Sequence, residues 1–402
     1  MKRNIDSDFA NSNDAFCMAP WSHIHVIPSG NAYPCCLIHG ETTLLGNVNE
    51  TSIEDIWNSE GLRELRLWML DGKKHKTCDW CYQKEEQFGE SFRKDFNQKY
   101  SNDLSLVNAT QDDGTVEEVQ MRYIDIRFSN LCNLKCRMCG PNFSSQYAAE
   151  SGHRPAIKKV PDGMIGEVYK YLETCEEIYF AGGEPLMMDE HYLLLEKMIE
   201  LGVKPRIRYN SNITKLKHKH WDILELWKNF DDIYIQASID GYKDELTYIR
   251  HPAKYDEIIE TALKYLTVRN VRIDISSCIG FWNILSLPEL HKDLLNKGVI
   301  RNYENFRFQP MIHPYWFTAK VLPKNIKDDA TVHIQNHIDF MKQNNVSDSY
   351  IDLWRGIVTF MNAEDHFDKW VEKGIDEIKN RDIIRNEDFV TTFPHLKGMI
   401  GV

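Results

Sequence analysis

Short apolar strands alternate with amphipathic helices between residues 120 and 320, and this alternation limits most strongly how the chain can fold. Helical patterns such as "HYLLLEKMIELG" and "YDEIIETALKYL" separate the strands, with apolar residues three or four apart. Single helices between strands imply right-handed crossovers and a parallel sheet. We therefore expect an α/β fold with a partial (β/α)6 barrel rather than a closed eight-stranded one. The expected strands are "YIDIRF", "EIYFAGG", "RIRYNSN", "DIYIQASID", "VRIDISSCIG" and "NFRFQP".

The rest of the chain differs in composition from this stretch. A cysteine- and aromatic-rich unit precedes it, a polar, turn-rich segment typical of a linker follows that unit, and a mostly helical extension ends the chain. The expected divisions are a small cysteine-rich domain at residues 1–98, a linker at 99–119, the partial barrel at 120–320 and the helical extension at 321–402.

The first unit carries local signals for a hairpin and two helices. "PSGNAYPCC" predicts the hairpin, and "ETSIEDIW" opens a helix with Thr51 and Glu54 spaced as a capping box. A second helix should bury Leu62, Leu65 and Met69 and end at "DG". We expect four tryptophans to form the core of the unit, namely Trp21, Trp57, Trp68 and Trp80.

Charge and hydropathy disfavour two classes of partner and leave room for a local basic patch. The 48 Lys and Arg residues against 60 Asp and Glu residues give a formal charge of -12, which offers no general attraction to nucleic acid or to anionic membranes. No apolar run approaches the roughly 20 residues that span a bilayer, and "MKRNIDSDFANSND" lacks the apolar stretch of a signal peptide. We therefore expect a cytoplasmic protein with reduced thiols.

Most of the ten cysteines are clustered, which favours metal binding or catalysis over disulfides. Cys175 and Cys278 stand alone, and we expect both to be small buried apolar residues. The clustered cysteines are Cys17, Cys35, Cys36, Cys78 and Cys81 in the first unit, and Cys132, Cys136 and Cys139 in the barrel.

The barrel cysteines stand in the pattern C-x-x-x-C-x-x-C directly after the first strand. Three thiolates can hold three irons of a 4Fe-4S cluster and leave the fourth iron open to a ligand. A structural zinc site normally uses four protein ligands. The residues "GGEP", "NSN" and "SID" follow the next three strands, so all these motifs should meet at one rim of the barrel.

"CNLKCRMC" followed by "GGEP" resembles the signature of the radical S-adenosylmethionine (radical SAM) superfamily, over roughly residues 120 to 320. The resemblance implies that SAM chelates the open iron of the cluster. One electron then cleaves SAM to methionine and a 5'-deoxyadenosyl radical, which abstracts a hydrogen atom from the substrate. A separate one-electron reductant such as flavodoxin or ferredoxin would supply that electron.

The resemblance also assigns SAM contacts. Glu184 is expected to accept from the methionine ammonium, and the two glycines before it to let the backbone approach the ligand. Asp240 could equally be a turn residue, and Arg250 could equally form a surface salt bridge. The expected cofactor contacts are Gly182, Gly183, Glu184, Pro185, Asn212, Ser238, Asp240 and Arg250, with Asn283 as a weaker candidate. No residue is assigned as catalytic acid or base.

The first unit is similar to the SPASM/twitch domains that hold auxiliary iron-sulfur clusters in radical SAM enzymes. Here it precedes the barrel instead of following it, and its cysteines suffice for one cluster only. The expected ligands are Cys17, Cys35, Cys78 and Cys81, with Cys36 as the alternative to Cys35. A zinc site with the same thiolates, or replacement of one thiolate by a nearby histidine, remains open. Those histidines are His23, His25 and His39.

The resemblance implies an oxidoreductase that modifies a peptide or protein side chain, because this is the commonest activity of the SPASM/twitch group. One alternative is a dehydrogenase or epimerase that acts on a sugar, a nucleoside or another small molecule. The non-enzymatic alternative is a zinc-stabilised interaction protein.

Overall fold

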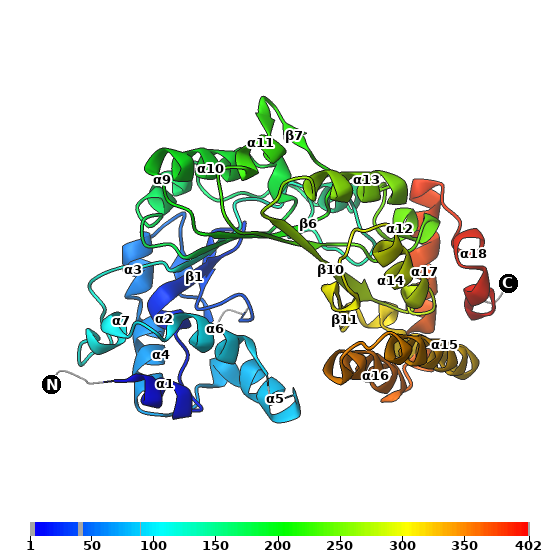
Figure 1. Ribbon diagram of the computed structural model, residues 1–402, viewed down its shortest axis with the longest axis horizontal. Coiled ribbons are helices and arrows are strands. Elements are labelled where there is room, and N and C mark those ends of the chain that lie inside the picture. The colour runs from blue at the N-terminus through cyan, green and yellow to red at the C-terminus, as the bar shows by residue number, and fades with distance from the viewer. Residues whose placement is uncertain (1–4, 39–42, 89, 401–402) are drawn as a thin grey trace. The chain divides into compact units, whose positions relative to one another are not determined.

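The computed structural model describes residues 5–38, 43–88 and 90–400 (Figure 1). The chain forms two compact units, each built from several chain segments. The first comprises Met1–Leu131, Arg154–Arg208 and Asn229–Asp232, and the second Cys132–His153, Tyr209–Lys228 and Ile233–Val402. The boundaries expected for the cysteine-rich domain, the linker and the extension stay predictions.

The strands of the first unit confirm the first two barrel strands and the N-terminal hairpin of the sequence analysis. β4 pairs in parallel with β5 and with β1, and β1 pairs antiparallel with β2. The bounds are β1 (His23–Val26), β2 (Asn31–Tyr33), β3 (Gly46–Asn47), β4 (Tyr123–Ile126) and β5 (Glu177–Phe180); β6 (Arg206–Ser211) begins in this unit and ends in the second. The α/β class with parallel strands is therefore confirmed.

The pairing of β1 with β4 was not foreseen from the sequence. All four residues of β1 are buried, and His25 lies opposite Asp125 in the parallel register. The His25 Nδ1 atom lies 3.0 Å from a carboxylate oxygen of Asp125, and both side chains are fully buried. A buried carboxylate requires such a partner, so this pair fixes the N-terminal hairpin onto the sheet.

Helices of the first unit begin and end close to where the sequence predicts. The expected capping box is wrong in detail, because the side chain of Ser52, not that of Thr51, accepts from the Asp55 N–H. The helices are α1 (Ser7–Ser12), α2 (Ala19–Ser22), α3 (Ile53–Trp57), α4 (Glu60–Leu70), α5 (Asp79–Phe88), α6 (Phe92–Tyr100), α7 (Ser105–Asn108), α9 (Met164–Tyr169) and α10 (Asp189–Leu201), with 3-10 turns η2 (Lys76–Cys78) and η3 (Pro185–Met187).

Burial in the first unit differs from the expectation at two tryptophans. Trp21 and Trp57 are fully buried, but Trp68 is 39% and Trp80 53% exposed. Trp80 lies between the two cysteines of "CDWC", in the first turn of α5, and lines the pocket that these cysteines share. The expected linker segment carries α7, and Thr110 in this segment accepts from the buried Trp21 indole N–H.

The second unit contains the remaining expected strands, with β10 parallel to both β9 and β11. Its strands are the end of β6, β7 (Lys217–His218), β8 (Trp221–Asp222), β9 (Ile233–Ala237), β10 (Val271–Ile279) and β11 (Phe306–Pro310). Its longer helices are α13 (Tyr255–Tyr265), α14 (Leu287–Asn296), α15 (Lys324–Gln343), α16 (Asp348–Asn362) and α17 (Phe367–Arg385). Its shorter helices are α8 (Ser145–Glu150), α11 (Ile223–Trp227), α12 (Asp244–Ile249) and α18 (Phe389–Thr392), with 3-10 turns η4 (Tyr303–Asn305), η5 (Tyr315–Phe317), η6 (Ala319–Val321) and η7 (Pro394–Ile400).

Buried apolar side chains pack the C-terminal helices against each other, as the spacing of these residues in the sequence predicts. Ile334, Ile338 and Met341 of α15 are buried, and α15 packs beside α16 (Figure 1). Within the described residues, no helix is both long and apolar enough to cross a membrane.

Candidate metal centres

The cysteine motif of the barrel forms a tight loop in the second unit. Cys132 and Cys136 are each 8% exposed, and the Cys139 N–H donates to the Cys136 carbonyl at 3.0 Å. The Leu134 N–H points at the Cys132 sulfur at 3.4 Å. Burial raises the pKa of the Cys139 thiol to about 12, with the neighbouring Cys136 adding to the shift. Bound iron must therefore displace protons from these thiols.

Two predicted SAM contacts lie against the cysteine sulfurs. The Asn212 amide nitrogen lies 3.8 Å from the Cys132 sulfur, and Arg250 Nη1 lies 3.8 Å from the Cys136 sulfur. Hydrogen bonds and positive charge around thiolates stabilise their ionised form and tune a cluster that they hold. Both side chains are therefore placed to support the thiolates directly.

Asp240 and Arg250 form a buried ion pair. Arg250 Nε lies 2.6 Å from one carboxylate oxygen of Asp240, and the Cys278 N–H donates to the other at 2.7 Å. The Asp240 carboxylate is fully buried and the Arg250 side chain is 13% exposed. The alternative that Arg250 forms a surface salt bridge is therefore wrong.

Asn283 and Cys278 lie beside the Asp240–Arg250 ion pair in the second unit. The Asn283 amide donates to the carbonyls of Asp240 and Cys278, which ties the ends of β9 and β10 together. Cys278 is only partly buried, unlike the expectation, whereas Cys175 is buried as expected. Ser238 lies near β9, and its N–H donates to the Ser211 carbonyl at 2.9 Å.

The "GGEP" segment lies in the first unit, pressed against the chain that leads to Cys132. The Gly183 N–H donates to Ser129 and the Glu184 N–H to Leu131, at 3.1 and 2.7 Å. A Cβ on Gly183 would lie 2.1 Å from the Leu131 carbonyl oxygen, and Gly182 has a φ of +120°. The glycines are thus required by a close approach of two backbones.

Glu184 is almost fully buried, and its carboxylate accepts from the Leu186 N–H at 3.2 Å. It therefore caps the 3-10 turn that begins at Pro185.

The C-terminal extension makes polar contacts that no local sequence motif predicts. Arg137, inside the cysteine motif, is fully buried, and its Nη2 lies 2.5 Å from Asp382 and 2.6 Å from Glu387. Its guanidinium stacks on the Tyr248 ring at 3.5 Å, and Tyr248 also donates to Asp382. A charge in this position requires partners, and α17 and the residues after it provide them.

A second group of ion pairs joins α17 to the same loop. Arg385 donates to Glu150 at 2.7 Å and to the Lys135 carbonyl at 2.7 Å. Lys135 Nζ and Arg381 also contact the Glu150 carboxylate, at 2.8 and 3.0 Å. These ion pairs therefore hold the cysteine loop and α8 against α17. The sequence does not predict this contact, because the residues are about 240 positions apart.

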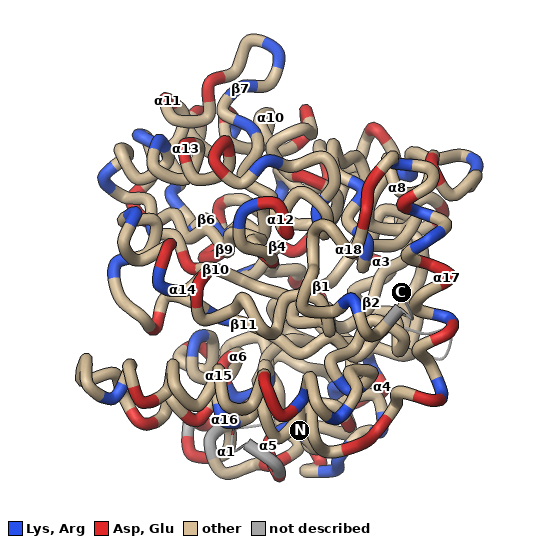
Figure 2. Tube along the Cα trace, turned by 90° about the vertical axis from the view of Figure 1, so that its right-hand side faces the viewer, with Lys and Arg blue, Asp and Glu red and all other residues tan. Residues whose placement is uncertain are grey.

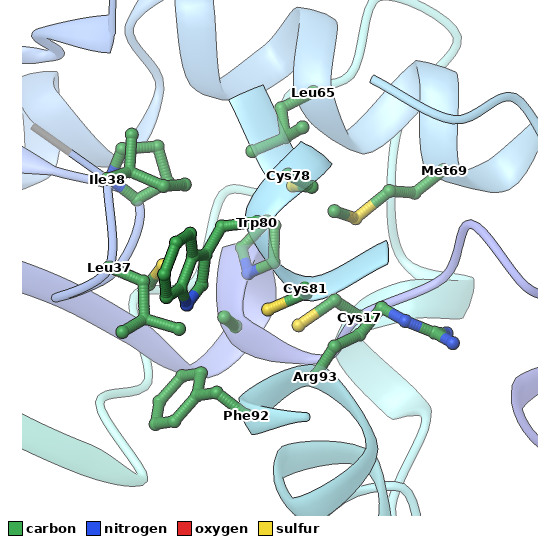
Figure 3. A pocket seen from close by; sticks show the side chains of 14 residues that line it. Cys17, Leu37, Ile38, Leu65, Met69, Cys78, Trp80, Cys81, Phe92 and Arg93 are labelled. Carbon is green, nitrogen blue, oxygen red and sulfur yellow. The ribbon is translucent and has the colours of Figure 1, made fainter. Parts of the chain in front are cut away.

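The N-terminal cysteines line one pocket in the first unit. Figure 3 shows the thiols of Cys17, Cys78 and Cys81 turned toward the same hollow, with Trp80 at its wall. Cys35 lines the same pocket and Cys36 does not. This arrangement gathers four sulfur donors, the set that a fully ligated 4Fe-4S cluster requires.

Hydrogen-bond donors surround these thiols. Burial raises the pKa of the Cys78 thiol to about 12, and the neighbouring Tyr82 hydroxyl opposes the shift. Backbone N–H groups of Ala19, Leu37 and Arg93 likewise oppose the rise in pKa. They act on the thiols of Cys17, Cys35 and Cys81, respectively. Donors to sulfur stabilise thiolates, so the pocket is prepared to hold a metal cluster.

Cys36 lies in a different environment from Cys35. Burial raises the pKa of the Cys36 thiol to about 12, and the nearest charges are Asp125, Arg127 and Arg208. Cys35 instead interacts with Cys78 and Cys17. Adjacent residues of an extended segment point to opposite sides, which explains the separation.

The histidines offered as replacement ligands are placed elsewhere. His23 and His25 are buried on β1, where their Nδ1 atoms contact the backbone carbonyls of Tyr123 and Asp125. His39 lies outside the described residues. In the described part of the chain, no three His, Cys, Asp or Glu side chains form a group that could hold a single metal ion.

Comparisons with known proteins assign the two regions to families. Residues 17–83 match the SPASM family, described as an iron-sulfur cluster-binding domain, and residues 126–292 match the radical SAM superfamily. No curated protein matches the chain.

Several solved structures resemble the fold. "Native anSMEcpe with bound AdoMet" is 16% identical with a TM-score of 0.38, and the match covers 65% of each chain. SuiB from Streptococcus suis bound to S-adenosylmethionine is 14% identical with a TM-score of 0.40, over 73% of this chain and 62% of SuiB. SuiB bound to its precursor peptide SuiA is 12% identical with a TM-score of 0.34, over 76% of each chain. The match thus spans less than two thirds of the first of these proteins.

Both family matches agree with the cysteine arrangement in their regions. SPASM and radical SAM domains imply 4Fe-4S clusters and SAM as cofactors. The chain therefore carries a SPASM domain match at its N-terminal side, followed by a radical SAM domain match.

Proposed function

We propose that this protein cleaves SAM reductively and uses the 5'-deoxyadenosyl radical to oxidise a peptide or protein side chain, assisted by one auxiliary cluster. The observation that carries the proposal is the presence of two separate cysteine sets. One is a three-cysteine loop supported by Asn212 and Arg250, and the other is a four-cysteine pocket. The peptide class rests on the SPASM match, as the resemblance implies.

A 4Fe-4S cluster on Cys132, Cys136 and Cys139 would supply the electron that cleaves SAM. The chain's own residues prepare this site. Asn212 and Arg250 stabilise the thiolates, and α17 holds the loop through Arg137. We assign Glu184 to the ammonium of SAM, with its carboxylate as the acceptor. Ser238 and Asp240 are proposed near the ribose, where Asp240 acts by holding Arg250 in place.

Cys17, Cys35, Cys78 and Cys81 are the proposed ligands of the auxiliary cluster. Four thiolates leave no iron open, so this cluster would accept an electron from the substrate radical and would not coordinate the substrate. Loss of one hydrogen atom, one electron and one proton then amounts to a two-electron oxidation of the side chain.

The test is formation of 5'-deoxyadenosine by anaerobically reconstituted protein reduced with dithionite. We expect the wild type to produce it, and the variant with Cys132, Cys136 and Cys139 all changed to alanine to produce none. The matched control changes Cys175 to alanine and should remain active. SAM cleavage by the triple variant would overturn the assignment. A product that forms with a sugar or nucleoside, and with no peptide, would overturn the substrate class.

A further inference from the structure

A surface pocket in the second unit shares its wall with the cysteine loop. Asn133 and Leu134, between Cys132 and Cys136, form one side of it, and α13 forms another. Thr214 and Lys215, which lead into the β7–β8 hairpin, also line it. The pocket therefore brings the surface within a few residues of two proposed cluster ligands.

A chain of hydrogen bonds joins the pocket wall to a proposed ligand. The Asn133 amide donates to Thr214 Oγ1 at 2.9 Å, and the Asn212 amide donates to Asn133 Oδ1 at 3.0 Å. The same Asn212 nitrogen lies 3.8 Å from the Cys132 sulfur. Because Asn133 also lines the pocket, only the Asn212 side chain lies between the pocket wall and the thiol.

The surface around the pocket is basic, in contrast to the chain as a whole. From Asn212 to Trp221 the sequence has three lysines, two histidines and no acidic residue, although the net charge of the chain is -12. Figure 2 shows basic residues at the end of the hairpin labelled β7. We call Lys215, Lys217 and Lys219, with Lys254 and Lys264 at the pocket, the hairpin patch.

The acidic residues near the patch do not reverse its charge. Glu257 and Glu260 line the pocket and pair with Lys254 and Lys264, and Asp222 pairs with Lys217. These are exposed pairs, which contribute little and exchange readily with other partners. The patch has five lysines against three carboxylates, so it keeps an excess of positive charge.

We propose that the hairpin patch is the docking surface for an acidic one-electron carrier protein, of the flavodoxin or ferredoxin class. The inference rests on the proposed function, since only a reducible cluster at the cysteine loop needs such a partner. One electron would leave the carrier's flavin or iron-sulfur centre, which is oxidised, and reduce the cluster by one. Complementary charge would bring the acidic face of the carrier to the pocket and speed encounter.

Three charge reversals test the proposal: Lys215→Glu, Lys217→Glu and Lys219→Glu in one variant. A matched control reverses three exposed lysines of the same unit that do not line the pocket, Lys297, Lys324 and Lys342. Binding of oxidised flavodoxin is measured by calorimetry at low salt. We expect affinity to fall roughly tenfold or more in the hairpin variant and little in the control.

Activity is then compared with two reductants. Flavodoxin-driven 5'-deoxyadenosine formation should fall in the hairpin variant, while dithionite-driven formation should equal that of the wild type. The dithionite reaction also shows whether the variant is folded. If the charge-reversed variant misfolds, a variant with Lys→Gln changes at the same positions replaces it. A wild type that fails with dithionite would refute the proposed function and not the docking surface.

Carbodiimide cross-linking gives a third measurement, independent of activity. Cross-links from flavodoxin carboxylates should map to the hairpin patch. Unchanged flavodoxin affinity in the hairpin variant, or cross-links only to other lysines, would overturn the proposal. Tight binding of RNA that is lost in the hairpin variant, with flavodoxin affinity unchanged, would assign the patch to nucleic acid instead.

Discussion

At the scale of single residues, the candidate site at the cysteine loop depends on buried charged side chains, each of which has few partners. The fully buried Asp240 carboxylate has its charge balanced by Arg250, which also reaches Cys136. Removing one member of such a pair leaves an uncompensated charge, which costs more than the pair itself contributes.

Arg250→Met should therefore lower the free energy of unfolding by about 3 to 5 kcal/mol. The double variant Arg250→Met, Asp240→Asn should recover much of this loss. Urea denaturation provides the measurement. The control Arg355→Met removes an exposed ion pair with Asp352 and should change stability by less than about 1 kcal/mol. Equal effects of the two single changes would contradict the assigned role of Arg250.

The neighbouring Cys35 and Cys36 provide a matched pair of substitutions. Cys35→Ser removes a thiol that lines the four-cysteine pocket, whereas Cys36→Ser changes a thiol near Asp125 and Arg127. We expect Cys36→Ser to keep the full iron content after anaerobic reconstitution, and Cys35→Ser to lose or destabilise the auxiliary cluster. The reverse result would make Cys36 the ligand.

At the scale of elements, α17 and the residues after it clamp the cysteine loop. Arg137 of the loop is fully buried and pairs with Asp382 and Glu387. Since this clamp comes from the C-terminal extension, the extension supports the radical SAM domain instead of forming an independent appendage.

The double variant Asp382→Asn, Glu387→Gln should loosen the loop, because Arg137 would stay buried without a countercharge. Iron held by the barrel motif should become more accessible to chelators, while iron in the N-terminal pocket should be unaffected. A control variant changes two exposed residues of α17, Glu372→Gln and Asp376→Asn. The rate of iron loss to a chelator is the measurement, and identical rates in both variants would contradict the clamp.

A buried histidine pair joins α14 to α15. His291 Nδ1 lies 3.0 Å from His337 Nε2, and His291 Nε2 donates to the Tyr303 carbonyl at 2.9 Å. Burial lowers the pKa of His291 to about 4, and burial together with the neighbouring His291 lowers that of His337 to about 3; the charge of Lys292 contributes to both shifts. Both imidazoles are therefore neutral in the folded protein at neutral pH.

Because the folded pKa values lie below the ordinary value of 6.5, the unfolded chain binds more protons at acidic pH. The stability from this pair is present above pH 6.5 and is lost as pH falls toward about 4, by up to about 1.4 kcal/mol per pH unit for each imidazole. Hydrogen exchange in α14 and α15 should increase in this window. His337→Gln should flatten the dependence, and an unchanged dependence in that variant would exclude the pair as its source.

At the scale of the whole molecule, the sequence predicts the strand order along the chain and the cysteine sets, because periodicity and ligand spacing are local properties. It does not predict the pairing of β1 with β4 or the contacts of Arg137 with Asp382, because both join distant segments. The exposure of Trp80 is also not predicted, since composition alone does not show which of the four tryptophans enter the core.

We propose that the two separate cysteine sets hold two iron-sulfur clusters. Metal and sulfide analysis of anaerobically reconstituted wild-type protein tests it most directly. Three plus four thiolates predict about eight irons and eight sulfides per chain and no zinc. Changing Cys78 and Cys81 to alanine should lower iron to about four in protein whose secondary structure is intact, and leave SAM cleavage in place. About four irons with one zinc in the wild type would contradict the two-cluster account.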